Sequence, residues 1–272
     1  MRHVGVGRAL RYCFIATILV CYLFPLGFLI NTALKSDASF YTNPGGLTRS
    51  LNFSNFPSAW YQGNFGSLML NSVIYTFCAA GLGTLVSLVI AVPVSRGYLR
   101  HSRLWYSLFV VLLFLPNILI AQFQIILRLG LYDSRLGYVI IAASGVGVGP
   151  LLVAGYMRSV PRELDEAAAI DGVGYGRFLL TFIPFLIKPV IATTFILQAI
   201  NVWNDIILAT VLLADPSKSP ITLGLYAFQG QYTSEWGVLA AGTMIVAGPL
   251  VVAYAFLQRY LIGGVLAGAV KG

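Results

Sequence analysis

The residues that could do chemistry fall into two groups along the chain. The first group is acidic and lies in one short segment, which holds four of the nine carboxylates of the sequence: Glu163, Asp165, Glu166 and Asp171. Pro161 can occupy a first helical turn, and the carboxylates that follow it suit the positive end of a helix dipole. Gly172 supplies a stop. The segment therefore predicts a short helix, and two interpretations are open. Either Glu166 pairs with an Arg or Lys side chain of a partner, or the helix packs back on the helices of its own chain.

The second group is a polar stripe inside an apolar run. Its members are spaced four, three and four residues apart, so that they share one face of a helix: Thr194, Gln198, Asn201 and Asp205. An acidic residue inside a membrane helix is costly and seldom faces lipid. Two interpretations are open, because such polar groups either line a polar pathway or form hydrogen bonds that hold neighbouring helices together.

No set of residues suited to catalysis or to metal binding accompanies these two groups. His3 and His101 lie in basic flanks, and Cys13, Cys21 and Cys78 fall inside apolar runs with neither zinc nor disulfide spacing. The chain also contains no Gly-x-x-x-x-Gly-Lys-Ser/Thr phosphate loop. The sequence therefore predicts a protein that is not an enzyme and that binds no metal or cofactor of its own.

The elements that position these groups follow from composition. Of 272 residues, 58% are hydrophobic and only 10% are charged, which excludes a soluble globule because so few charges cannot cover its surface. We expect an all-α polytopic membrane protein, with residues 1–272 forming a single transmembrane domain and residues 158–186 forming a loop outside the bilayer. Six apolar runs are long enough to span: residues 12–32, 68–94, 104–127, 136–157, 187–213 and 237–258.

The basic residues predict the orientation. With the N-terminus in the cytoplasm, twelve of the 17 Lys and Arg residues face inward. The remaining five lie in the outer loops: Lys35, Arg49, Arg128, Arg135 and Lys218. The positive-inside rule therefore favours both termini in the cytoplasm. Topology and anionic lipid headgroups account for the net charge of +8, so nucleic acid is not expected as a partner.

The acidic segment also resembles a known family. Glu166-Ala167-Ala168-Ala169-Ile170-Asp171-Gly172, followed by a Pro-containing apolar run, resembles the EAA loop of permease subunits of bacterial ABC importers. Further motifs occur in the expected order and resemble the carbohydrate-importer branch, whose best-known members are the maltose permeases: residues 31–35, 130–134, 203–205 and 268–272.

The resemblance implies a subunit of a larger importer in the bacterial inner membrane. A second permease would complete the pore, two cytoplasmic ATPases would bind ATP and magnesium, and an extracytoplasmic binding protein would deliver a di- or oligosaccharide. The residues implied for coupling to the ATPase are Glu166 as the charged contact, Ala167 and Ala168 as the close-packing surface, Asp171, and Gly172 as the turn. The residues implied for the pathway are Gln198, Asn201, Trp203, which could stack on a sugar ring, and Asp205.

One departure from the family and two alternatives belong to this interpretation. The family usually places the Pro of the loop thirteen residues after its Gly, whereas Gly172 and Pro184 are twelve apart; in an α-helix that difference turns the following segment by about 100°.

A secondary transporter without an ATPase is the alternative function, but it would be expected to show inverted repeats. Aromatic residues in segments 33–66 and 214–236 suit either interfacial belts or a docking surface for an external protein.

Overall fold

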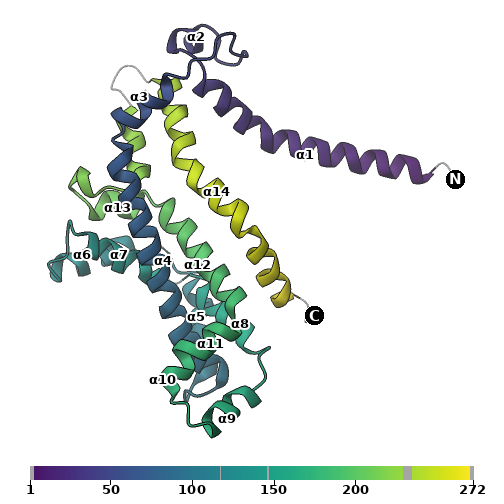
Figure 1. Cartoon of the computed structure of the whole chain (residues 1–272), viewed down its shortest axis with the longest axis vertical. Helices are drawn as coiled ribbons and strands as arrows, with labels where there is room; N and C mark the ends of the chain where they lie inside the picture. Colours follow the sequence, from purple (N-terminus) through teal and green to yellow (C-terminus); the bar gives the residue numbers. More distant parts are fainter. Residues whose placement is uncertain (1–2, 117, 146, 229–234, 270–272) are drawn as a thin grey trace. The chain divides into compact units, whose positions relative to one another are not determined.

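The computed structural model describes residues 3–116, 118–145, 147–228 and 235–269, and within these ranges every regular element is helical (Figure 1). The α-helices are α1 (His3–Ala33), α2 (Asp37–Thr42), α3 (Asn55–Gln62), α4 (Phe65–Arg96), α5 (Ser102–Leu112), α6 (Leu119–Arg128), α7 (Arg135–Ser144), α8 (Gly149–Met157), α9 (Glu163–Ile170), α10 (Tyr175–Arg177), α11 (Ile183–Leu186), α12 (Lys188–Trp203), α13 (Ile207–Leu212) and α14 (Trp236–Ala269). A π-helix, η1 (Phe178–Phe182), and two 3₁₀-helices, η2 (Pro216–Lys218) and η3 (Ile221–Phe228), complete the set.

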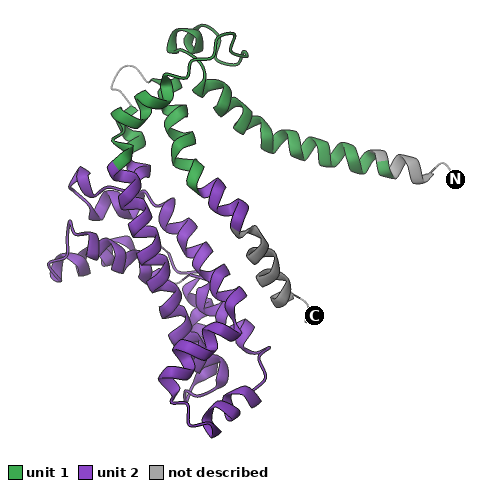
Figure 2. Ribbon diagram, in the orientation of Figure 1, with its two compact units in different colours: residues 1–66, 224–249 green, residues 67–223, 250–272 purple. Residues whose placement is uncertain are grey.

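The chain divides into two compact units, which Figure 2 colours separately. The first unit comprises residues 1–66 and 224–249, and the second comprises residues 67–223 and 250–272. The predicted acidic segment and the predicted polar stripe both belong to the second unit. The fold of that unit therefore positions both groups.

In the first unit, the loop after α1 is tied down by polar side chains of the 31–35 motif. The buried Lys35 donates from Nζ to the carbonyls of Asn43 and Pro44, at 2.8 and 3.1 Å. Asn31 donates to the Gly46 carbonyl at 3.0 Å, and Asn55 donates to the Lys35 carbonyl at 2.7 Å. This motif therefore orders the loop that follows α1.

In the second unit, the main core surrounds the C-terminal half of α4. Its buried side chains come from α4, α8, α9, the π-helix η1, α11 and α12 and include Val92, Met157, Phe178 and Ile183. Gly149 allows α8 to approach closely, because a Cβ there would lie 2.5 Å from the Ser87 hydroxyl oxygen on α4. Small residues serve helix packing in membranes in this way.

Each of the six predicted apolar runs contains helical residues, but not every run is one unbroken helix. Three helices are long and apolar enough to cross a membrane: Leu10–Ala33, Phe65–Arg96 and Trp236–Phe256. The described residues contain up to five such spans if each bent helix pair counts as one. The number of spans and the cytoplasmic placement of both termini therefore stay predictions.

The predicted runs 104–127, 136–157 and 187–213 are each interrupted, and local residues explain the breaks. The first is divided between α5 and α6 near Pro116, which cannot donate a helical hydrogen bond. Between α7 and α8, Gly147 has a φ of +46°, a conformation outside the right-handed helix. The third break separates α12 from α13, at a carboxylate of the polar stripe described below.

Candidate functional site

The acidic segment folds into α9, and its end is well defined. Glu163, Asp165 and Glu166 occupy the first turn. After the last turn, Gly172 adopts a φ of +71°; its amide donates to the Ala169 carbonyl at 3.1 Å, and the amide of the next residue donates to the Ala168 carbonyl at 2.9 Å. These two bonds form a Schellman motif, which satisfies the last carbonyls of the helix and requires a left-handed residue. The predicted stop at Gly172 is thus present.

A buried ion pair fixes α9 to the C-terminal end of α4. The guanidinium of Arg96 lies 2.7 Å from one carboxylate oxygen of Asp165 through Nε and donates to the other at 2.8 Å through Nη2. The two side chains are only 3% and 10% exposed. Arg96 also donates from Nη1 to the carbonyls of Met157 and Val160, at 3.1 and 2.8 Å. One side chain therefore joins α4, the end of α8 and α9.

Tyr98 adds a second donor to the same carboxylate. Its hydroxyl donates to Asp165 Oδ2 at 2.7 Å. Partial burial of the phenol, together with its hydrogen bond to the Asp165 carboxylate, raises the pKa of Tyr98 to about 12. The phenol is therefore protonated at neutral pH and remains a donor to Asp165.

The two faces of α9 differ in exposure. Ala168 is buried among the chain's own side chains, whereas Glu166 and Ala167 are exposed. Ile170, the last residue of α9, is 85% exposed, which is unusual for a large apolar side chain. It lies directly before Asp171. The outward face thus consists of a carboxylate, small side chains and one isolated apolar residue.

The segment after α9 leaves α-geometry. Residues 178–182 form the π-helix η1, so the rotation of about 100° expected for a missing residue, which assumes 3.6 residues per turn, does not apply to this stretch. The helical segment Tyr175–Leu186 then meets α12 at an angle of 89°. A right-angled arm therefore connects α9 with the helix that carries the polar stripe.

The polar stripe borders a cavity of about 590 Å³ in the second unit. Gln198, Asn201 and Asp205 are among its lining residues, together with Gln122 and Asn204. Gln198 donates to the Ala142 carbonyl at 3.1 Å and is nearly buried. The amide of Asn201, in contrast, has no hydrogen-bond partner among the residues that the structure describes. Asn201 is therefore the stripe residue most available to a solute.

The other stripe residues have structural neighbours. Asp205 accepts from the amides of Leu208 and Ala209, at 3.2 and 2.9 Å, and from the Tyr138 hydroxyl at 3.0 Å. It thus caps the start of α13, which explains the break in this apolar run. Trp203 is 5% exposed and is not among the lining residues of the cavity. The structure brings Gln198, Asn201 and Asp205 to one cavity but leaves Trp203 outside it.

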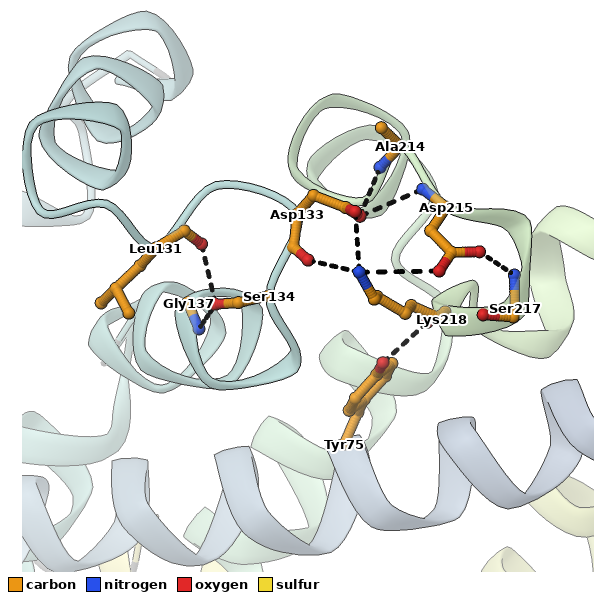
Figure 3. A network of polar contacts seen from close by, with 9 residues as sticks. All are labelled: Tyr75, Leu131, Asp133, Ser134, Gly137, Ala214, Asp215, Ser217 and Lys218. Carbon is orange, nitrogen blue, oxygen red and sulfur yellow. Dashed lines mark hydrogen bonds and ion pairs between the residues drawn. The ribbon is translucent and has the colours of Figure 1, made fainter.

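A second polar network, which sequence reasoning missed, joins the segments that follow α6 and α13 beside Tyr75 of α4 (Figure 3). Lys218 Nζ donates to Asp133 Oδ2 at 2.7 Å and lies 3.6 Å from an oxygen of Asp215. Asp133 also accepts from the amides of Ala214 and Asp215, each at 3.0 Å. The Tyr75 hydroxyl donates to the Lys218 carbonyl at 2.7 Å. This clamp, defined as Asp133, Lys218 and Asp215, joins the 130–134 motif to the segment after α13.

The clamp predicts a pH-dependent stability. Hydrogen bonds from Lys218 and from the Asp215 amide lower the pKa of the Asp133 carboxyl below 3.8. A depressed pKa in the folded state stabilises the fold above pH 3.8, and this contribution is lost as the pH falls from 3.8 through the lower folded value. We therefore expect Asp133→Asn to lower the midpoint of thermal unfolding at neutral pH, with the difference from the wild type closing below that range.

Thermal unfolding curves recorded over pH check this expectation. Glu163→Gln is the control, because the exposed Glu163 carboxylate forms no ion pair within the described residues. A difference between Asp133→Asn and the wild type that stays constant at every pH would contradict the assignment of the effect to this carboxylate.

Comparisons with known proteins agree with this architecture. Residues 79–265 match the family described as binding-protein-dependent transport system inner membrane component. The chain is 30% identical to the probable ABC transporter permease protein YurM of Bacillus subtilis, over 98% of this chain and 90% of that one. It is 28% identical to the melibiose/raffinose/stachyose import permease protein MelC of Bacillus subtilis, over 95% of both chains.

A solved structure has the same fold. A chain of a bacterial ABC transporter involved in the import of the acidic polysaccharide alginate superimposes with a TM-score of 0.84, at 23% identity, over 96% of this chain and 98% of that one. The family match covers more than half of the sequence, and it includes α9, the ion pair that anchors it and the polar cavity. The chain therefore belongs to the binding-protein-dependent transport system inner membrane components, the permease subunits of ABC importers.

Proposed function

We propose that the chain forms the pore of an ATP-driven di- or oligosaccharide importer with a second permease, and that α9 docks into a cytoplasmic ATPase subunit. The observation that carries the proposal is the anchoring of α9. Its outward face offers Glu166 and Ala167, while the Arg96–Asp165 ion pair fixes its inward side to α4. A helix held in this way can pass on the movement of a docked partner as a rigid-body displacement.

The remaining parts of the importer are separate chains. Two ATPase subunits bind ATP and magnesium, and an extracytoplasmic binding protein delivers the solute. The permease itself crosses the bacterial inner membrane six times with both termini in the cytoplasm, with the interrupted runs each counted as one span. The basic loops on the inner side support this orientation.

The coupling residues divide their roles between the two faces of α9. Glu166 pairs with a basic residue of the ATPase, and Ala167 allows its backbone to approach closely. Ala168 secures α9 from its own side, since it is buried in the core of the second unit. Asp171 and Gly172 end the helix and turn the chain toward η1.

Two observations support a di- or oligosaccharide as the transported solute. The name of MelC states import of melibiose, raffinose and stachyose for that relative, which shares 28% identity with this chain. The cavity of about 590 Å³ falls within the range of small-molecule sites, roughly 300–1,000 Å³, and carries unpaired amide groups that suit sugar hydroxyls. Gln198, Asn201 and Asp205 border the pathway, and Trp203 supports it from the buried side.

The decisive experiment purifies the chain from membranes with the subunits that accompany it. An ATPase and a second permease should co-purify, and ATP hydrolysis should rise when a binding protein loaded with melibiose or raffinose is added, but not with the empty binding protein. Solute uptake without any associated ATPase would instead establish a secondary transporter and overturn the proposal.

The pathway assignment predicts an effect at Asn201. Asn201→Ala removes an unpaired amide from the cavity, and the loss of one hydrogen bond of about 1 kcal/mol corresponds to roughly a fivefold rise in the half-saturating sugar concentration. Sugar uptake measured against concentration, with the binding protein in excess, checks the value. The control is Thr194→Val, since Thr194 is buried on the same helix face but does not line the cavity. Equal curves for both variants and the wild type would remove Asn201 from the pathway.

A further inference from the structure

A second cavity of the permease is lined by arginines and by no carboxylate. It has a volume of about 510 Å³ and lies where the end of α4, the first turns of α5 and the end of α8 come together. Arg103, Arg158 and Arg162 line it, along with Tyr106. An adjoining cavity of about 490 Å³ shares Arg158 and Arg162 and has Glu163 at its border. The region therefore concentrates positive charge around two adjoining, solvent-accessible cavities.

These arginines are not neutralised within the chain. No carboxylate of the described residues lies within ion-pair distance of Arg103, Arg158 or Arg162, in contrast to the paired Arg96 nearby. The guanidinium of Arg158 lies over the Tyr106 ring, 4.4 Å from its centroid, and Arg162 donates to the Arg96 carbonyl at 3.3 Å. Three guanidinium groups that border one cavity and form no ion pair with a carboxylate of the described residues attract an anion.

Among the polar side chains that line the cavity, the guanidinium groups are the hydrogen-bond donors still available to a ligand. The hydroxyls of Ser95, Ser102 and Ser107, which line the same cavity, already donate to backbone carbonyls at 2.8, 2.7 and 3.0 Å. The planar fork of a guanidinium matches two oxygens of a phosphate group. The positive end of the α5 dipole lies at the same place and adds to the attraction.

The surface beside the cavity indicates where the phosphate comes from. On α5, Leu104 and Trp105 directly follow Arg103 and are 59% and 48% exposed, and Leu108 is 39% exposed one turn later. In a membrane protein such apolar side chains face the hydrocarbon, and Trp is typical of the interface with the headgroups. The cavity thus adjoins an exposed apolar surface that includes a Trp, as expected where a protein meets the headgroup region of a bilayer.

We propose that the cavity lined by Arg103, Arg158 and Arg162 binds the phosphate of an anionic phospholipid headgroup. Basic cavities between helices at a membrane surface recognise such headgroups. The proposal depends on the membrane location of the family and not on the identity of the transported solute, so the two can fail separately.

The test uses the full chain, purified with its accompanying subunits and placed in nanodiscs of phosphatidylcholine with increasing phosphatidylglycerol. Tightly bound phosphatidylglycerol is counted by native mass spectrometry, and its affinity is taken from the titration. Each arginine near a membrane surface is worth about 1 kcal/mol, or roughly fivefold, so Arg103→Gln combined with Arg158→Gln should weaken this lipid's binding by about 30-fold. Arg100→Gln is the matched control, because Arg100 is exposed in the preceding loop but does not line the cavity.

The outcomes are distinct. Loss of one tightly bound phosphatidylglycerol in the double variant, with none lost in Arg100→Gln, supports the proposal. Unchanged lipid binding in the double variant overturns it, and so does displacement of the lipid by inorganic phosphate, which would indicate a soluble phosphate compound. Loss of the ATPase subunits with unchanged lipid would assign the surface to a protein contact instead. If the double variant does not fold, Arg103→Gln alone decides, since the Arg103 side chain has no hydrogen bond or ion pair to lose within the described residues. The ATP hydrolysis of the wild type reports separately on the proposed transport function.

Discussion

Asp165→Ala is expected to separate ATP hydrolysis from solute uptake. The substitution removes the carboxylate that pairs with Arg96 at 2.7 and 2.8 Å and leaves a guanidinium that is only 3% exposed without its counter-charge. Removing one partner of a buried pair typically costs about 3–5 kcal/mol. Because 1.4 kcal/mol already changes an equilibrium tenfold, we expect α9 to lose its fixed position and uptake to fall by at least about tenfold.

The location of the loss follows from the remaining contacts of Arg96. Its bonds to the carbonyls of Met157 and Val160 do not involve Asp165 and can persist. The loosened element is therefore α9 itself, the part proposed to dock into the ATPase, while α4 and α8 stay joined. We expect ATP hydrolysis to continue but to respond less to the loaded binding protein.

The measurement compares uptake with ATP hydrolysis in reconstituted vesicles, at equal abundance of the permease in the membrane. Glu163→Gln is the control, since Glu163 lies in the same first turn but is exposed. The exchange Arg96→Asp with Asp165→Arg should restore part of the coupling if the pair itself matters. Normal uptake by Asp165→Ala would show that the ion pair does not position α9.

The short acidic helix could be predicted from sequence because its signals are local. Pro161, the carboxylates of the first turn and Gly172 each act within a few residues. The helix ends at the predicted Gly172, but it begins at Glu163, so Pro161 precedes the helix and does not occupy its first turn. Its anchor could not be predicted in the same way. Arg96 lies 69 positions before Asp165 and, by sequence, is only one more basic residue at the inner end of an apolar run. The pairing depends on how α4 and α9 pack, which no local pattern reports.

The polar stripe shows a different limit of sequence reasoning. Gln198, Asn201 and Asp205 line one cavity, but the spacing argument assumed an unbroken helix to residue 213, and Asp205 lies beyond the end of α12. Hydropathy measures apolar content and not backbone continuity. The carboxylate of Asp205 caps α13 instead, which ends α12 at Trp203. A carboxylate three and four residues before apolar residues is a capping signal, and that signal was present in the sequence.

The clamp of Asp133, Lys218 and Asp215 was missed for a related reason. By sequence alone, the 130–134 motif shows only a likeness to a family, and Lys218 is one of five outer basic residues. Asp133 has a φ of +52°, a conformation that Asp tolerates better than most residues. The same residue therefore turns the chain and supplies the carboxylate that accepts from Lys218 and from two backbone amides. Sequence spacing does not reveal such a backbone conformation.

Gly172→Val is expected to uncouple transport by a mechanism independent of the ion pair. The residue has a φ of +71°, and its amide forms one bond of the Schellman motif that ends α9. A left-handed backbone costs an L-residue about 1–2 kcal/mol, and a β-branched side chain lies at the upper end of that range. No heavy atom of the described residues lies within 4 Å of a Cβ added there, so the expected cost comes from the backbone conformation and not from crowding at Cβ.

Two further substitutions isolate that cause. Gly172→Asn should retain most of the coupling, because Asn adopts the left-handed conformation more readily than Val. Gly176→Ala should retain all of it, since Gly176 lies in α10 without a positive φ and a Cβ there also meets no atom within 4 Å. The ratio of uptake to ATP hydrolysis should therefore fall most for Val, by about fivefold to thirtyfold for a cost of 1–2 kcal/mol. Equal ratios for Val, Asn and wild type would exclude the turn at Gly172 from coupling, even if Asp165→Ala behaved as expected.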